Sequence, residues 1–507
     1  MKAHSLLPPT LLVAFSTLLS KFLGVIRDHL LAKTFGATGG EGIYNLDTYY
    51  AAFRIPDLLY NLLIFGTLSA AFIPIFIRYK KNRDTKNAWE FANSMLHLLF
   101  LGTLVLAVIL FILAPLLAHV VAGGFGAADL ELTTKLMRLM LLSPIFFSLS
   151  AVFISIQDSF KHFFFRSLAP LFYNFGIILG IVYFGTEFGV MGVTWGVIIG
   201  SVLQLLIQIP ALKQVGFRYT PILGYQRRDV KEAIRLMGPR ILGLSINQLT
   251  LLVNTLIGSF LMTGSIAIFN LADNLQSLPL GLVGISFAIT SFATLSELAT
   301  EPTPEQFSRE IRRVVNQILI LIIPATLGML VLRNEIIDVI LVGGRFSSAD
   351  ALLTSRVLAY FLISLFAQSL IPLLSRGFYA YHNTRTPVVT ALIGAFISIA
   401  GSLLFGLYLN YGIAGVAISV SAGNLLNWFL LHVRMARHLK QNIVDGVNLF
   451  KILFSSVLMA AAVLWVKQWI PFEGSLLQKI GWLLIPTVIG LVVYFLLGLL
   501  LRIQRAA

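Results

Sequence analysis

Long, nearly unbroken apolar runs dominate this sequence and most constrain how the chain can fold. A membrane-spanning helix needs about 20 mostly apolar residues, because the hydrocarbon core of a bilayer is about 30 Å thick. Transmembrane β-strands are shorter and alternate in polarity, so continuous runs favour helices. We therefore predict an all-α polytopic membrane protein with fourteen transmembrane helices, near 8–32, 46–77, 91–120, 132–156, 164–184, 189–212, 234–262, 265–296, 314–333, 351–375, 387–409, 412–433, 451–470 and 480–501.

The charge content and the motif content agree with this class. Of the 507 residues, only 12% are charged, whereas a soluble domain carries about 25%. The chain has no cysteine, which excludes disulfides, thiolate metal sites and a cysteine nucleophile. The histidines show no metal-ligand spacing, and the sequence has no phosphate-binding loop, HExxH or GxSxG motif. We therefore expect a protein that is not an enzyme and that uses no metal or cofactor.

Lysine and arginine concentrate in alternate connections between the predicted spans. The net charge is +15, and cations gather in the loops 78–86, 213–235 and 434–451, whereas the loops 121–130 and 185–188 have none. Because cytoplasmic loops collect Lys and Arg, this pattern predicts that both termini are cytoplasmic. Topology thus explains the positive charge, and we expect no nucleic-acid partner.

The chain also repeats itself. Residues 125–129 (FGAAD) match 346–350 (FSSAD) at an offset of 221, and residues 189–193 (GVMGV) match 412–416 (GIAGV) at an offset of 223. Six spans restore the original orientation, so the halves are expected to be parallel repeats around an axis along the membrane normal. We predict six-helix lobes at 1–222 and 223–440, with two extra helices at 441–507. Two facing lobes of this kind suggest a cavity and alternating access.

Ionisable residues cluster inside the first two spans. A charge in a membrane span is costly and marks a functional site by default. These two spans hold three cations and three acids: Lys21, Arg27, Arg54, Asp28, Asp47 and Asp57. Cations that face a water-filled cavity suit a substrate with phosphate or carboxylate groups. The alternative is that these residues form ion pairs that lock helices together, with the outer ones reaching the interface.

The seventh and eighth spans offer fewer such residues. Arg240 lies near the start of the seventh span, and Asp273 and Asn274 lie in the eighth. We predict these three as contributors from the second lobe. Pro56 is expected to bend or break the second helix, because proline removes a backbone hydrogen bond.

Five segments of the sequence, taken together in their order along the chain, resemble the bacterial lipid II flippase family, called MurJ or MviN. They are residues 20–28 (SKFLGVIRD), 52–59 (AFRIPDLL), 66–74 (GTLSAAFIP), 344–350 (GRFSSAD) and 377–387 (GFYAYHNTRTP). The resemblance covers essentially the whole chain and implies the fold of the multidrug/oligosaccharidyl-lipid/polysaccharide exporter superfamily. It implies transport of undecaprenyl-pyrophosphate-linked peptidoglycan precursor from the inner to the outer leaflet of the bacterial cytoplasmic membrane.

This resemblance gives the charges a role. It implies a cationic cavity in which Lys21, Arg27 and Arg54 bind the pyrophosphate. Their charge partners would be Asp28, Asp47 and Asp57. The two C-terminal helices would form a groove for the lipid tail. The implied partners are the lipid-linked precursor, membrane lipids and cell-wall synthesis proteins.

Four positions depart from the family pattern. Lys21 stands where arginine is usual, and lysine keeps the charge but loses the bidentate fork. Tyr60 and Asn274 stand where further arginines are common, and Phe65 stands where a glutamate is common. These departures leave three alternatives open: a flippase for another polyprenyl-linked glycan, a cation-coupled exporter of the same superfamily, and a non-transporting scaffold for cell-wall synthesis.

Overall fold

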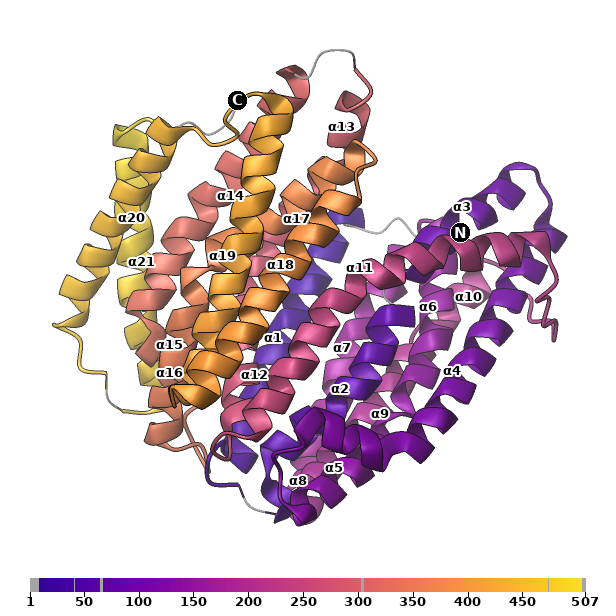
Figure 1. The fold of residues 1–507 in the computed structure, drawn as a ribbon, viewed down its shortest axis with the longest axis horizontal. Coiled ribbons are helices and arrows are strands. Elements are labelled where there is room, and N and C mark those ends of the chain that lie inside the picture. Colours follow the sequence, from indigo (N-terminus) through magenta and orange to yellow (C-terminus); the bar gives the residue numbers. More distant parts are fainter. Residues whose placement is uncertain (1–8, 41, 64–66, 302–304, 473, 504–507) are drawn as a thin grey trace. The chain divides into compact units, whose positions relative to one another are not determined.

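Helices form the regular structure of this computed structural model, which describes residues 9–40, 42–63, 67–301, 305–472 and 474–503 (Figure 1). The chain divides into two compact units. Unit 1 comprises residues 1–267 together with 343–346, and unit 2 comprises residues 268–342 together with 347–507.

Unit 1 is a bundle of eleven named α-helices within the described residues. They are α1 (Pro9–Phe35), α2 (Leu46–Leu63), α3 (Thr67–Lys81), α4 (Thr85–Ala122), α5 (Ala127–Met140), α6 (Ser143–Ser159), α7 (Phe163–Leu179), α8 (Gly185–Phe188), α9 (Val190–Leu206), α10 (Ile209–Gln214) and α11 (Arg228–Ser259). A core of aromatic and aliphatic side chains joins α3, α4 and α6, with Phe72, Phe76 and Phe91 fully buried at its centre. This core holds together the end of the unit where the cationic connections lie.

Unit 2 contains the remaining helices. They are α12 (Ser265–Pro279), which begins in unit 1, and α13 (Ser286–Leu298), α14 (Glu305–Val331), α15 (Arg333–Ile340), α16 (Ser348–Ile363), α17 (Leu365–Ala380), α18 (Arg385–Gly401), α19 (Gly412–Leu439), α20 (Gly446–Lys467) and α21 (Leu476–Leu500). The last two pack against each other, and α20 also packs along α14.

The helices confirm a multi-pass, all-α membrane protein. Within the described residues, ten helical stretches are long and apolar enough to cross a bilayer, and the pair α16 and α17, bent by 43°, makes eleven. The other three predicted spans correspond to α1, to α2 with α3, and to α11. The number fourteen therefore stays a prediction.

Several of the predicted spans contain two α-helices: 132–156 (α5 and α6), 189–212 (α9 and α10), 265–296 (α12 and α13) and 351–375 (α16 and α17). The span 46–77 contains α2 and α3, which are separated by residues outside the described part of the chain. Pro56 does not break the second helix, because α2 continues through it to Leu63, and the bend stays a prediction. Proline is tolerated inside membrane helices, since neighbouring groups satisfy the freed carbonyl.

The repeated motifs adopt matching local structures. Helix α5 begins at Ala127 and α16 begins at Ser348, so the FxxAD motif marks a helix start in both halves. At the second start, Ser347 and Asp350 form a reciprocal capping box, which satisfies two backbone N–H groups. The repeated glycines Gly189 and Gly412 have φ angles of 61° and 59°, a left-handed conformation that glycine adopts at little cost.

Small residues allow two helix pairs to approach closely. Gly196 of α9 lies against Gly180, where an added Cβ would come within 2.8 Å of the Gly180 Cα. In unit 2, a Cβ on Gly394 of α18 would come within 2.7 Å of the backbone oxygen of Gly423 of α19. Membrane helices associate mainly through such packing, because lipid tails provide no hydrophobic drive between them.

Candidate functional site

A buried ion pair forms the centre of the candidate site in unit 1. Arg27 of α1 donates hydrogen bonds through Nε and Nη2 to one carboxylate oxygen of Asp28, at 3.0 and 2.8 Å. Its Nη1 donates to the side-chain oxygen of Asn174 on α7, at 3.1 Å. The guanidinium side chain stays 23% exposed, while Asp28 is buried. The arrangement therefore fixes a positive charge inside the bundle without enclosing it completely.

Asn174 was not predicted from the sequence, although it orients Arg27. Its amide nitrogen lies 3.3 Å from the backbone oxygens of Ser20 and Pro170. Because the amide donates to these carbonyls, its oxygen is left to accept from Arg27. An asparagine in an apolar run is the only sequence signal for this role.

Arg54, the second predicted cation, lies on α2 and reaches α11. Its Nε donates a 2.7 Å hydrogen bond to the Thr255 hydroxyl, which in turn donates to the backbone oxygen of Leu251. Asp57, one turn further along α2, accepts a hydrogen bond from the Asn61 amide at 2.8 Å. These contacts hold the polar face of α2 in a defined orientation.

Asp47 caps a helix. The backbone N–H groups of Gly264 and Ala267 each donate to a different Asp47 carboxylate oxygen, both at 2.7 Å. Ala267 belongs to the first turn of α12 and Gly264 directly precedes this helix, and N–H groups at a helix start have no intrahelical partners. Asp47 is 1% exposed, so this carboxylate is buried at the start of α12. The sequence did not predict this capping role.

The other predicted site residues are less closely defined. Lys21 is half-buried on α1, and Tyr60 of α2 packs its ring 4.8 Å from the ring of Phe147. In unit 2, Asp273 accepts a 2.8 Å hydrogen bond from Gln276, and Asn274 is half-buried. Phe65 and the side chain of Arg240 lie outside the part of the chain that the structure describes. Of the predicted residues, Arg27 and Asp28 are directly paired.

Residues 343–346 pack onto the end of α1. The backbone N–H of Arg345 donates to the Lys33 carbonyl at 2.9 Å, and its guanidinium lies 3.9 Å from the centre of the Tyr44 ring. A Cβ on Gly36 would come within 2.6 Å of the Arg345 oxygen, so this close approach requires glycine. The GRFSSAD segment thus contributes its first half to unit 1 and its second half to the start of α16.

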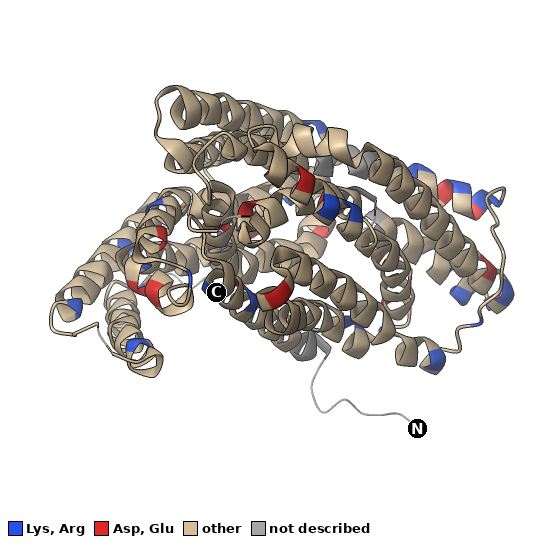
Figure 2. Ribbon diagram, turned by 90° about the horizontal axis from the view of Figure 1, so that it is seen from below, with Lys and Arg blue, Asp and Glu red and all other residues tan. Residues whose placement is uncertain are grey.

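Charged residues are sparse along most of the ribbon (Figure 2). One group of charged side chains connects α3, α4 and the start of α11. Arg227 forms ion pairs with Glu90 at 2.6 Å and with Asp229 at 3.0 Å. Tyr79 donates a 2.9 Å hydrogen bond to Asp229. Burial raises the pKa of the Asp229 carboxyl, but hydrogen bonds from Arg227 and Tyr79 and the charge of Arg227 outweigh it, so the pKa lies below its ordinary value.

An apolar pocket of about 540 Å³ lies within unit 2. Helices α14, α16, α17, α19 and α20 supply its lining, which includes Leu327, Phe366, Trp428 and Leu449. Such a lining accepts hydrocarbon rather than charged groups. Among the described residues, no group of three His, Asp or Glu side chains is placed to hold a metal ion.

Comparisons with known proteins agree with this architecture. The family model described as "Lipid II flippase MurJ" matches residues 31–481. A probable lipid II flippase MurJ from Buchnera aphidicola (strain APS) is 30% identical over 84% of this chain and 83% of its own length. The relative from Thermotoga maritima is 28% identical over 98% of this chain and 97% of its own.

Solved structures give the same result. The structure titled "Lipid II flippase MurJ, inward closed conformation" is 26% identical, with a TM-score of 0.80 over 97% of this chain and 99% of that one. An inward-facing multidrug transporter of the MOP superfamily is 14% identical, with a TM-score of 0.70 over 83% of this chain and 94% of that chain, and this likeness shows a shared fold. With matches that span nearly its whole length, the chain belongs to the lipid II flippase MurJ family.

Proposed function

We propose that this protein is a flippase that moves lipid II, the undecaprenyl-pyrophosphate-linked peptidoglycan precursor, from the inner to the outer leaflet by alternating access. The observation that carries this proposal is the match to lipid II flippases along almost the entire chain. The protein would act as a transporter and make or break no covalent bond. It would work in the bacterial inner membrane with fourteen spans, lobes at 1–222 and 223–440, and both termini in the cytoplasm.

The pyrophosphate would bind the cations of unit 1. Arg27 and Arg54 are supported by their fixed surroundings, since each donates to a neighbouring helix and neither residue is fully buried. Guanidinium groups suit phosphate oxygens, because their planar fork can donate two parallel hydrogen bonds. Lys21 on α1 would add a third charge, and Asp28 would orient Arg27. Asp57 would hold the polar face of α2, with Arg240, Asp273 and Asn274 as contributors from the second lobe.

The lipid tail would occupy apolar surface in unit 2. The 540 Å³ pocket supports this role, because its lining is almost entirely hydrocarbon and includes the first turns of α20. Part of a long isoprenoid chain would lie there while the head group crosses among polar residues. Residues 441–507 would contribute to this groove mainly through α20.

A flippase for another polyprenyl-linked glycan is the second candidate. It is favoured by Tyr60, whose ring packs on Phe147 at a position where the family commonly has a cavity arginine. Loss of a cation there points to a different set of contacts with the head group. Both candidates share the pyrophosphate and the isoprenoid tail, so they differ only in the glycan.

The deciding experiment expresses this protein in bacteria depleted of their own lipid II flippase. We expect lipid II to become accessible at the outer face and growth to resume. Exposure of another polyprenyl-linked glycan, without exposure of lipid II, would favour the second candidate. A correctly inserted protein that exposes neither lipid would refute the proposal of flippase activity.

A further inference from the structure

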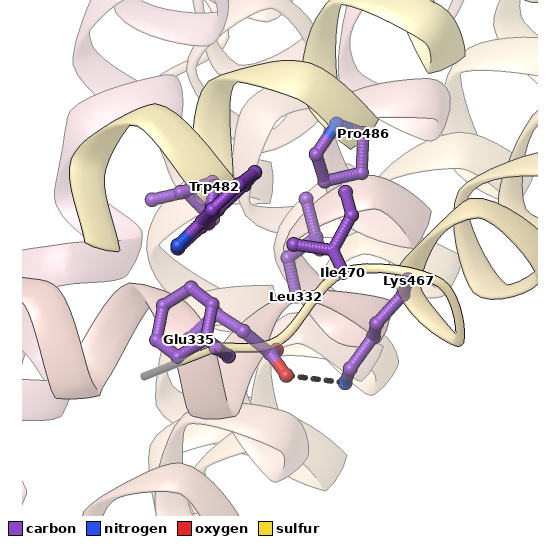
Figure 3. Close-up of a pocket in the computed structure, with 8 residues that line it drawn as sticks. Leu332, Glu335, Lys467, Ile470, Trp482 and Pro486 are labelled. Atoms are coloured by element: carbon purple, nitrogen blue, oxygen red, sulfur yellow. Dashed lines mark ion pairs between the residues drawn. The ribbon is translucent and has the colours of Figure 1, made fainter. Parts of the chain in front are cut away.

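A second, smaller pocket lies in unit 2 where α15 meets the ends of α20 and α21. Its volume is about 80 Å³, and its lining includes Glu335, Lys467, Phe472, Trp482 and Pro486. Figure 3 shows the Glu335–Lys467 ion pair on one side of the pocket and Trp482 and Pro486 on the other. A water needs roughly 10–15 Å³ of such space, so the pocket has room for a small polar group with one or two carbons.

One carboxylate oxygen of Glu335 lacks a hydrogen-bond partner among the described residues. Glu335 is only 9% exposed and lines the pocket, and one of its oxygens lies 2.5 Å from the Lys467 ammonium. The other oxygen, Oε2, is buried and is the one without a partner. A buried acceptor left in this state costs free energy, so a hydrogen-bond donor that reaches Oε2 from the pocket is stabilised there.

The pocket lies at the depth of lipid head groups. Trp465 and Trp469, in the last turn of α20 and just beyond it, are 62% and 74% exposed on either side of Lys467. Exposed tryptophans of membrane proteins concentrate at the interface between hydrocarbon and water. A ligand that enters here therefore comes from the membrane surface.

The charges and rings of the lining define the chemistry of that ligand. A carboxylate oxygen binds a positively charged donor more strongly than a neutral one, and the lining includes the aromatic residues Trp482 and Phe472, which favour an organic ammonium. The described residues hold no cluster suited to a metal ion. Lys467, whose side chain is 33% exposed, offers a cation to a phosphate just outside.

We infer that this pocket binds the head group of a phosphatidylethanolamine-type phospholipid, with its ammonium donating to Glu335 Oε2 and its phosphate beside Lys467. A phosphatidylcholine ammonium has no N–H to donate. The hydroxyls of phosphatidylglycerol can donate to the carboxylate oxygen, but they carry no positive charge and make a weaker hydrogen bond. The site thus selects a zwitterionic lipid with a primary ammonium, separately from the transported substrate.

Native mass spectrometry of the full-length protein tests this inference. Phosphatidylethanolamine, phosphatidylcholine and phosphatidylglycerol with identical acyl chains are added in turn. We expect the wild type to retain phosphatidylethanolamine about tenfold better than either other lipid, which is the effect of one charge-assisted hydrogen bond. Glu335→Gln should remove this preference, because the amide replaces the free acceptor with a donor.

Asp338→Asn provides the matched control. Asp338 lies one turn beyond Glu335 on α15 and pairs with Lys479 at 2.6 Å, outside the pocket lining. Its substitution also breaks an ion pair to this helix hairpin but should leave the preference intact. Trp482→Leu keeps the ion pair and should weaken retention of phosphatidylethanolamine several-fold. Equal retention of the three lipids by the wild type, or an unchanged preference in both pocket variants, would overturn the inference.

Discussion

Arg27 shows how a charge can be kept usable inside a membrane protein. Asp28 offsets the cost of burying the guanidinium, and Asn174 fixes its direction with a neutral acceptor. A second carboxylate in place of Asn174 would hold the cation more tightly but would compete with a phosphate ligand. Asp28 and Asn174 therefore stabilise the guanidinium of Arg27 while its charge stays available to a phosphate ligand.

Asn174→Ala should lower transport by roughly tenfold, which corresponds to the loss of one hydrogen bond to a charged group. The fold should be retained, since Asp28 still pairs with Arg27. Lipid II exposure in flippase-depleted cells measures the effect. Ser167→Ala, on the same helix, removes only a bond to the Phe163 carbonyl and should leave transport unchanged. Equal activity of the two variants would argue against a positioning role for Asn174.

Asp229 predicts an acid-sensitive contribution to stability. Its pKa in the folded protein lies below its ordinary value, so it stabilises the fold above about pH 4 and loses this effect as the pH falls through the folded pKa. Thermal unfolding between pH 7 and pH 3 should show a smaller acid-induced drop for Asp229→Asn than for the wild type. Glu187→Gln, which removes a carboxylate at an exposed position, serves as the control. An identical drop in wild type and Asp229→Asn would contradict this prediction.

The sequence predicted the location of these charges better than their partners. Arg27, Arg54 and Asp57 stand out because ionisable residues are rare in apolar runs. Asp47 stood out for the same reason, yet it caps α12 through residues more than 200 positions away. Sequence spacing cannot reveal a partner on a distant segment, and for the same reason Thr255 and Asn174 were missed.

At the scale of elements, hydrophobic patterning locates helices but does not show where they break. The run at 351–375 reads as one span, whereas the structure has α16 and α17 within it, bent by 43°. Apolar composition shows which segments lie in lipid. It does not show where a helix breaks, because a break depends on local backbone geometry and tertiary packing. The repeated motifs were more informative, because FxxAD and the paired glycines each mark a helix start in both halves.

The contact between α9 and Gly180 should tolerate no large side chain. Gly196→Leu is expected to destabilise the protein by about 1–3 kcal/mol, because the helices must separate to admit it. Gly102→Leu on α4 is the control, since open space surrounds that position. Thermal unfolding in detergent compares the two variants. A similar unfolding midpoint for both would show that the close helix contact is not required.

The apolar pocket in unit 2 should respond to a bulky residue. Leu449→Trp on α20 fills part of it and should reduce transport several-fold by displacing the lipid tail. Val457→Trp, at a 56% exposed position of the same helix, adds the same side chain toward the lipid and should have little effect. The lipid II exposure assay distinguishes them. Full transport by Leu449→Trp would mean that the tail does not use this pocket.

At the scale of the whole molecule, a few charges carry the function in a chain built mostly from apolar helices. Many Lys and Arg residues lie in connections or near helix ends, where some are already paired, as Arg78 in the last turn of α3 is with Glu232. Arg27 and Arg54 differ because they lie in the middle of α1 and α2. The central claim is that these two cations handle the pyrophosphate.

Lipid II exposure in flippase-depleted cells tests that claim most directly. Wild type, Arg27→Ala, Arg54→Ala and Lys135→Ala are compared at equal membrane abundance. Lys135 is the control, because its ion pair with Glu131 is exposed on α5. We predict that wild type and Lys135→Ala expose lipid II and that both arginine variants lose at least about nine-tenths of the activity, as expected when a charge-assisted contact worth at least about 1.4 kcal/mol is removed. If both arginine variants instead expose as much lipid II as the wild type, the pyrophosphate does not depend on these cations and the account is contradicted.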